Sequence, residues 1–98
     1  MGLLRRRIID SSIEEKILTG MIVSDSFCRD ISKIIGKDSF SVPFIARVVT
    51  WCKDYHKKYK QAPGIHISDI FEIEKDKIDD SDQKAISKML AKLSEDHQ

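Results

Sequence analysis

The side chains best suited to metal binding or nucleophilic catalysis are three histidines and two cysteines: His56, His66, His97, Cys28 and Cys52. The histidines are scattered, and none stands at metal-ligand spacing from another histidine or cysteine. Cys52 and His56 are four residues apart and could share a helix face, either as a metal or catalytic pair or as a half-buried histidine beside a core cysteine. The pair stands alone, so the second interpretation is favoured. Both cysteines occupy apolar positions of helical patterns and are expected to be buried thiols.

Nucleotide and calcium sites are not predicted either. A phosphate-binding loop needs spaced glycines followed by Lys and Ser or Thr, whereas the one Gly-Lys pair, Gly36-Lys37, precedes Asp38 and has no glycine five residues before it. The acidic run between positions 76 and 82 lacks the alternating oxygen ligands and final Glu of a calcium loop, so we expect it to be solvated and to cap a helix. The sequence therefore predicts no catalytic machinery, cofactor or metal in this chain.

Composition points to one globular domain. The 98 residues are 41% apolar and 34% charged, with 17 basic and 16 acidic side chains and a net charge of +1. A dedicated nucleic-acid-binding domain usually carries a clear basic excess. Here the basic residues form only local clusters. Arg5, Arg6 and Arg7 are predicted to lie in a flexible arm over 1–11, either as a solubilising terminus or as a weak nucleic-acid contact. The second cluster is Lys53, Lys57, Lys58 and Lys60.

No targeting or membrane segment is predicted. Asp10, Ser11 and Ser12 interrupt any apolar run after the arginines, and no stretch approaches the ~20 apolar residues of a membrane span. A cytoplasmic protein is expected.

Apolar residues recur every three or four positions, which predicts helices. The first is expected from about Ile13, because Ser12 and Glu15 form a capping box. The second is expected over 27–35, closed by Gly36 in a left-handed conformation. The third is expected to be capped by Ser41, to carry Pro43 in its first turn and to run to about position 59 or 60. Its apolar sector comprises Phe44, Ile45, Val48, Val49, Cys52, Tyr55 and Tyr59.

The segment 61–64, Gln-Ala-Pro-Gly, is the strongest break in the chain. A short fourth helix is expected from about Ile67, followed by a charged loop or frayed end over 72–80. Asp80 and Gln83 are expected to cap a last helix. Four or five helices with short connectors predict an all-α fold, a compact bundle spanning 12–98 whose last helix could enter a helical hairpin.

Two groups of residues are candidates for a protein interface. Trp51 lies at the margin of the third helix's apolar sector beside Arg47 and Lys58, where it is either a core-margin residue, the favoured interpretation, or an interface anchor. The last helix carries the stripe Ile86, Met89, Leu90 and Leu93. That stripe either completes the core or pairs with the same helix of another subunit.

Several segments resemble the N-terminal domain of DnaB-type replicative DNA helicases, in the form common in the phage-like branch. Segment 13–22, Ile-Glu-Glu-Lys-Ile-Leu-Thr-Gly-Met-Ile, resembles its Glu-rich opening, apolar pair, glycine position and second apolar cluster. Segments 27–35, 38–40 and 42–59 resemble its second helix, its acidic-then-Phe connector and its long third helix. Segment 55–63, followed by 65–71, resembles the aromatic-rich helix end and the proline-led fourth helix. The resemblance covers about residues 12–75.

The resemblance implies a helical head leading into a hairpin that pairs subunits, in a collar that organises a ring and docks primase or a helicase loader. Self-association as a dimer building toward a hexamer is implied, in a bacterial or phage-infected cell, with DNA bound only weakly if at all. ATP and Mg²⁺ would belong to a RecA-like motor outside this chain. Two alternatives stay open: a free-standing helical DNA-binding or replication-accessory protein that uses the arginine and lysine clusters, and the helicase-binding domain of a primase.

Overall fold

The computed structural model describes residues 11–96 and is all-α, as predicted. Arg5, Arg6, Arg7 and His97 lie outside the described residues, so the expectations for the basic arm do too. Within 11–96 there are five α-helices and two short 3₁₀ turns, with no strand. In chain order they are α2 (Ser11–Val23), α3 (Asp25–Ser32), η1 (Lys37–Ser39), α4 (Pro43–Tyr59), α5 (His66–Glu74), η2 (Lys75–Lys77) and α6 (Asp80–Asp96).

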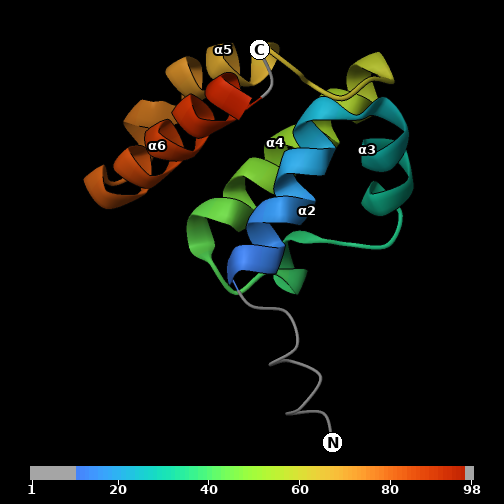
Figure 1. Ribbon diagram of the computed structural model, residues 1–98, viewed down its shortest axis with the longest axis horizontal. Helices are drawn as coiled ribbons and strands as arrows, with labels where there is room; N and C mark the ends of the chain where they lie inside the picture. The colour runs from blue at the N-terminus through green and yellow to red at the C-terminus, as the bar shows by residue number, and fades with distance from the viewer. Residues whose placement is uncertain (1–10, 97–98) are drawn as a thin grey trace, which may run out of the picture.

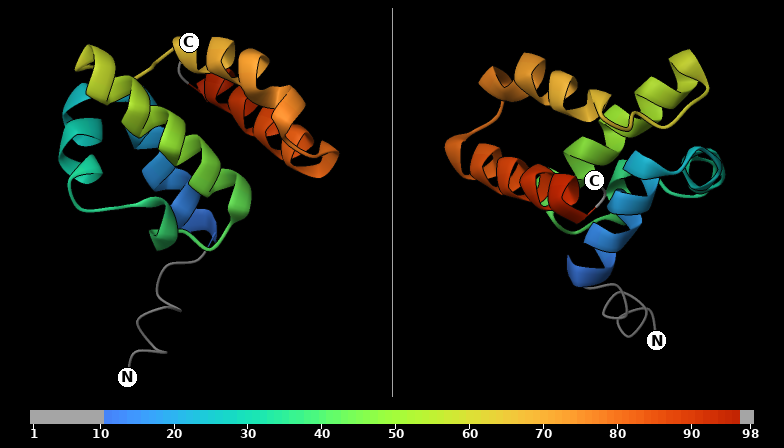
Figure 2. Two further views of the ribbon diagram at one scale, coloured as in Figure 1. Left: turned by 180° about the vertical axis from the view of Figure 1, so that it is seen from behind. Right: turned by 45° about the horizontal axis from the view of Figure 1, so that its top comes forward.

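Helix α4 is the centre of the arrangement, because it contacts each of the other four α-helices. Helices α2 and α3 pack on one side of it, and α5 and α6 lie on the other (Figure 1). The two views in Figure 2 show the α5–α6 pair set apart from the α2–α3 corner, with α4 joining them. No helix in residues 11–96 is long and apolar enough to cross a membrane.

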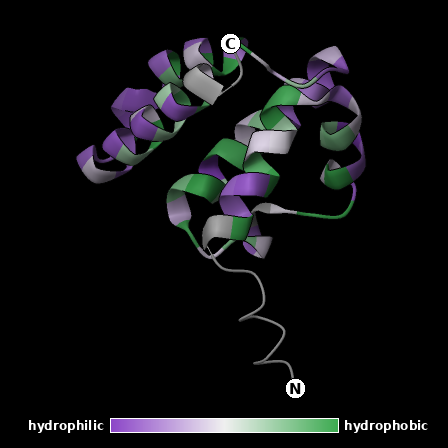
Figure 3. Cartoon of the chain, viewed as in Figure 1, coloured by the Kyte–Doolittle hydropathy of each residue, from purple (hydrophilic) through white to green (hydrophobic). Residues whose placement is uncertain are grey.

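One hydrophobic core runs between these helices. Figure 3 shows hydrophobic residues gathered where α2 and α4 pack, and hydrophilic residues prevailing on α5 and α6. The fully or nearly fully buried apolar side chains come from all five described α-helices and from three connectors. They are Leu18, Met21, Ile22, Cys28, Phe40, Ile45, Val48, Val49, Trp51, Cys52, Ala62, Ile67, Phe71, Ile78, Ile86 and Met89.

The start of α4 differs from the prediction that Ser41 caps it. The N-cap is Val42, with no side-chain cap of its own and Pro43 at the first helical position. The acceptor comes instead from α2, because the Glu14 carboxylate accepts from the Val42 N–H at 3.2 Å and the Ser41 N–H at 3.1 Å. The Ser41 hydroxyl also donates to it, at 2.6 Å. Glu14 is 1% exposed, so a buried acid on another helix stabilises this helix end.

Other helix ends also differ from their predictions. Helix α2 begins at Ser11, so Ser12 lies inside the helix and not at its cap. The fourth helix reaches Glu74 and continues as η2, where a loop was expected. Helix α6 is capped by Asp79, whose carboxylate accepts from the Asp82 N–H at 3.0 Å, so the predicted cap at Asp80 is one residue late.

Left-handed backbone occurs where α4 ends and not where α3 ends. Helix α3 stops at Ser32, with Ser24 as its N-cap, and Gly36 lies beyond it without a positive φ. The prediction that Gly36 closes this helix is therefore wrong. Lys60 has φ 61°, and its N–H donates to the His56 carbonyl oxygen at 2.7 Å. A residue with a Cβ is strained in this region.

Replacing Lys60 with glycine is expected to raise the free energy of unfolding by about 0.5–1 kcal/mol, because the relieved strain exceeds the extra entropy of glycine in the unfolded chain. Chemical denaturation of the two proteins measures the difference. Lys57→Gly, at an exposed position inside α4, is the control and should lower stability by about 1 kcal/mol. If both substitutions lowered the free energy of unfolding equally, Lys60 would not be strained.

Candidate functional site

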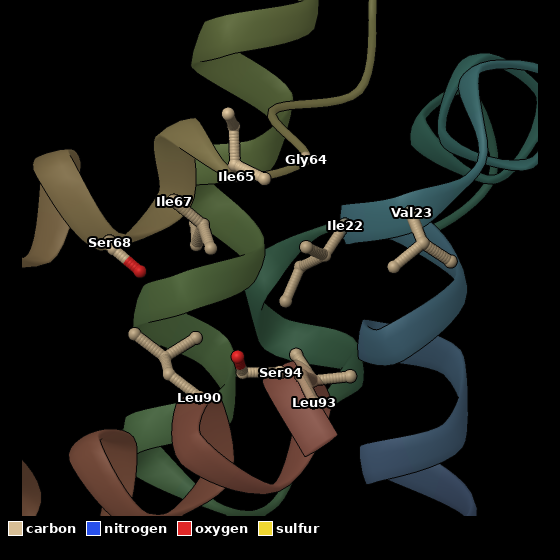
Figure 4. Close-up of a pocket in the computed structure, with 9 residues that line it drawn as sticks. All are labelled: Ile22, Val23, Gly64, Ile65, Ile67, Ser68, Leu90, Leu93 and Ser94. Carbon is tan, nitrogen blue, oxygen red and sulfur yellow. The ribbon is translucent and has the colours of Figure 1, made fainter. Parts of the chain in front are cut away.

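An apolar groove lies between the end of α2, the start of α5 and the last turns of α6. Its volume is about 520 Å³. Figure 4 shows Leu90 and Leu93 on α6 lying opposite Ile67 and Ile22, with Ile65 and Val23 at the rim. Among the described lining residues, the polar side-chain groups are two serine hydroxyls. The lining consists of Ile22, Val23, Gly64, Ile65, Ile67, Ser68, Leu90, Leu93 and Ser94.

The segment 61–64 holds one wall of this groove in place. The Gly64 N–H donates to the Ile22 carbonyl oxygen at 2.7 Å, and the Ala62 N–H donates to the Asp25 carboxylate at 2.9 Å. Both bonds tie the segment to the corner between α2 and α3. Gly64 has φ 54°, which a glycine adopts without strain. The chain therefore turns sharply and presents the next residue, Ile65, to solvent.

Exposure separates the rim of the groove from its floor. Ile65 is 86% exposed and Val23 is 46% exposed, whereas Ile22 and Ile67 are buried. Single exposed apolar residues are common on proteins. Here they border a hollow that is itself apolar, and contiguous apolar surface of this kind is typical of binding sites.

The last helix contributes to this groove with only half of its predicted stripe. Ile86 and Met89 are 0% and 6% exposed and belong to the core. They complete the core, so they are not surface available for pairing α6 with another copy. Leu90 and Leu93 are half-buried and line the groove.

Trp51 also belongs to the core. It is 8% exposed, and its ring centroid lies 6.4 Å from that of Phe71 on α5. This burial bears out the core-margin interpretation and removes Trp51 as an exposed anchor. Arg47 is exposed and lines a shallow depression with one edge of Trp51, whereas exposed Lys58 is not part of it. The structure does not join these three residues into one surface.

Of the residues that line the groove, the sequence predicted only Leu90 and Leu93 as interface candidates. The residues it missed are Ile22, Val23, Gly64, Ile65, Ile67, Ser68 and Ser94. The nearest signal was Ile65 itself, which directly follows the Pro-Gly break at a point where no helical stripe requires an apolar residue. The fourth helix was expected from about Ile67 and begins at His66, so Ile65 lies outside it. Only the placement of α2 and α6 against this segment shows that Ile65 is solvent-facing and borders a hollow.

The cysteines are buried free thiols, as predicted. Burial raises the pKa of both Cys28 and Cys52, and for Cys52 the nearby Cys28 adds to the effect. Thiols with raised pKa are protonated at neutral pH and are poor nucleophiles. Within residues 11–96, no three His, Cys, Asp or Glu side chains are grouped so that they could hold a metal ion.

Comparison with known proteins finds no match among protein-family models, curated proteins or solved structures.

Proposed function

We propose that this chain is an assembly and partner-docking domain of a replicative DNA helicase, and that its apolar groove pairs it with a second subunit. The helicase assignment rests on the resemblance of residues 12–75 to the DnaB-type N-terminal domain. The observation that carries the docking role is the groove itself, with strongly exposed Ile65 at its rim.

The occupant of the groove is a second copy of the chain because the surface carries both halves of a contact. Ile65 projects beside the hollow formed by Ile67, Leu90 and Leu93, so a two-fold axis near the rim would insert each Ile65 into the partner's groove. Among the described residues that line the groove none is charged, so these side chains add no like-charge repulsion when two copies meet. Such pairing is the step from which a ring of subunits is built, and primase or loader docks on the assembled collar.

The pairing is tested by the oligomeric state of the purified chain, measured by sedimentation equilibrium up to about 500 μM. We expect a reversible dimer, and we expect Ile65→Gln to weaken it at least tenfold, about 1.4 kcal/mol or more. The matched control is Ile73→Gln. Ile73 is 72% exposed on α5 but does not line the groove, so this variant should dimerise like the wild type.

Either of two results in this assay would overturn the pairing: a wild-type chain that stays monomeric throughout, or equal dimerisation by both glutamine variants. The pairing would also be overturned if the groove bound primase or a loader from the same genome, depending on Ile65, and did not bind a second copy of the chain. The helicase assignment has its own test in the coding sequence after Gln98. A linker followed by a Gly-rich, Lys-Thr-containing nucleotide loop supports it, and a stop codon there favours an accessory protein.

A further inference from the structure

Three ring side chains lie against one another where α4 ends and α5 begins. The ring centroids of Tyr55 and Tyr59 are 4.5 Å apart, with an interplanar angle of 42°. The His66 ring stacks on Tyr55 at 5.9 Å and 20°. We call Tyr55, Tyr59 and His66 the aromatic array. Its two outer members face solvent, since Tyr59 is 52% exposed and the His66 side chain is 56% exposed.

Three lysines near the array pair with no carboxylate whose side chain the structure describes. Lys57, Lys58 and Lys60 are exposed, and the Lys58 ammonium lies 5.5 Å from the centre of the Tyr59 ring. None of the ion pairs formed among residues 11–96 uses these three lysines. The acidic side chain paired with the array is Asp69, 3.7 Å from His66 Nδ1. The local balance is therefore basic, although the chain as a whole is nearly neutral.

The rest of the original lysine cluster has a structural role. The Lys53 ammonium donates to the Ile35 carbonyl oxygen at 2.9 Å and holds the segment after α3 against α4. Lys53 lies on an earlier turn of α4 than the other three lysines, on the side that faces α3. The last turns of α4, which with the C-cap carry the remaining three lysines and the two tyrosines of the array, project beyond α2 and α3 in both views of Figure 2.

We propose that this corner of the molecule binds single-stranded nucleic acid, with bases stacked on Tyr59 and His66 and phosphates contacted by Lys57, Lys58 and Lys60. Exposed rings beside a positive surface are how proteins bind single strands without sequence preference, because every base has a face that can stack. A duplex buries those faces within its own stack and offers only its phosphates and groove edges. The pairing of rings with cations thus selects single strands over duplex.

This site is distinct from the groove, although Ile65 lies next to His66 in the chain. The groove is apolar and lined by α2, α5 and α6, whereas the array lies mainly on α4. A subunit in a helicase collar would use the groove to assemble and the array to hold a strand near the ring. Subunit pairing through the groove and strand binding by the array can therefore be disrupted independently.

The experiment measures fluorescence anisotropy of labelled dT12, rU12 and a 12-base-pair duplex with the full chain at about 50 mM salt. Both single strands are expected to bind more tightly than the duplex, and the tighter of the two identifies DNA or RNA as the natural ligand. Tyr59→Ala should weaken single-strand binding about tenfold, and Tyr59→Phe should bind within about twofold of the wild type, because stacking needs the ring and not the hydroxyl. Circular dichroism of each variant checks that the fold is retained.

The lysines are tested through the dependence of affinity on salt. Replacing Lys57, Lys58 and Lys60 with glutamine should reduce the slope of log affinity against log salt by about 2, since each phosphate contact contributes about 0.7 on a single strand. The matched control is the same replacement at Lys84, Lys88 and Lys92, three exposed lysines on α6. That control should leave the slope unchanged.

Four results would overturn the proposal: no binding to either single strand, binding to duplex as tight as to single strands, an unchanged affinity in Tyr59→Ala, or equal slope changes in the two lysine triples. An unchanged affinity in Tyr59→Ala would mean that any binding does not depend on stacking against Tyr59. Ile65→Gln should bind single strands like the wild type, and Tyr59→Ala should dimerise like the wild type. Failure of one proposal is thereby distinguished from failure of the other.

Discussion

Replacing Glu14 with alanine is expected to lower the free energy of unfolding by about 3 kcal/mol. The Glu14 carboxylate, 1% exposed, accepts from the backbone N–H groups of Ser41 and Val42 and from the Ser41 hydroxyl. Alanine would leave those backbone donors without their acceptor at the start of the central helix, where the negative charge also interacts favourably with the helix dipole. The free energy of unfolding of a protein domain is typically about 5–15 kcal/mol, so this loss is a large fraction of the total stability.

Urea denaturation followed by circular dichroism measures this loss. Glu14→Gln keeps the shape and one acceptor oxygen but loses the charge, so it should fall between the wild type and Glu14→Ala. The matched control is Glu15→Ala, at the neighbouring, less buried position on the same turn of α2, and it should stay within about 0.5 kcal/mol of the wild type. If Glu14→Ala were as mild as Glu15→Ala, the carboxylate would not be an important cap of α4.

Gly20→Leu is expected to destabilise the chain by about 2–3 kcal/mol, although leucine is the better helix former. A Cβ built on Gly20 would lie 2.7 Å from Cδ2 and 2.8 Å from Cε2 of the Phe27 ring. The ring packs there because α2 and α3 meet at a tight corner after Val23. A larger side chain must push Phe27 away and open that corner.

A double-mutant cycle shows whether the clash is the cause. Phe27→Ala removes the ring, so Gly20→Leu in that background should cost much less than in the wild type, with a coupling of about 1–2 kcal/mol. Gly36→Leu is the matched glycine control, because a Cβ at Gly36 meets nothing within 4 Å and its φ is not positive. Equal costs for Gly20→Leu with and without Phe27 would mean that the ring is not the obstacle.

The existence and order of the helices were predictable because each depends on near neighbours in the chain. A period of three to four apolar residues specifies a helix whatever it packs against. The Pro-Gly break at 63–64 keeps α4 from continuing into α5 by backbone geometry alone. Burial of Cys28 and Cys52 followed from their places in those stripes.

Helix ends and the candidate sites were less predictable, because residues far apart in the sequence decide them. The α4 cap lies 27 and 28 residues away from the amides it accepts from, and no local spacing encodes that distance. The predicted stripe on the last helix was real, but its division between the core at Ile86 and Met89 and the groove at Leu90 and Leu93 depends on where α5 and α2 lie. The aromatic array likewise joins Tyr55 and Tyr59 to His66 across the break.

The amino-acid sequence by itself determined that this protein is a set of short amphipathic helices with two buried thiols and a sharp turn before α5, because hydrophobic periodicity and backbone preferences act over a few residues. The tertiary structure alone decided which acid caps the central helix, which isoleucine is left in solvent and which rings meet. A helix period tells which side chains share a face, and only the helices packed against that face determine which of them water still reaches.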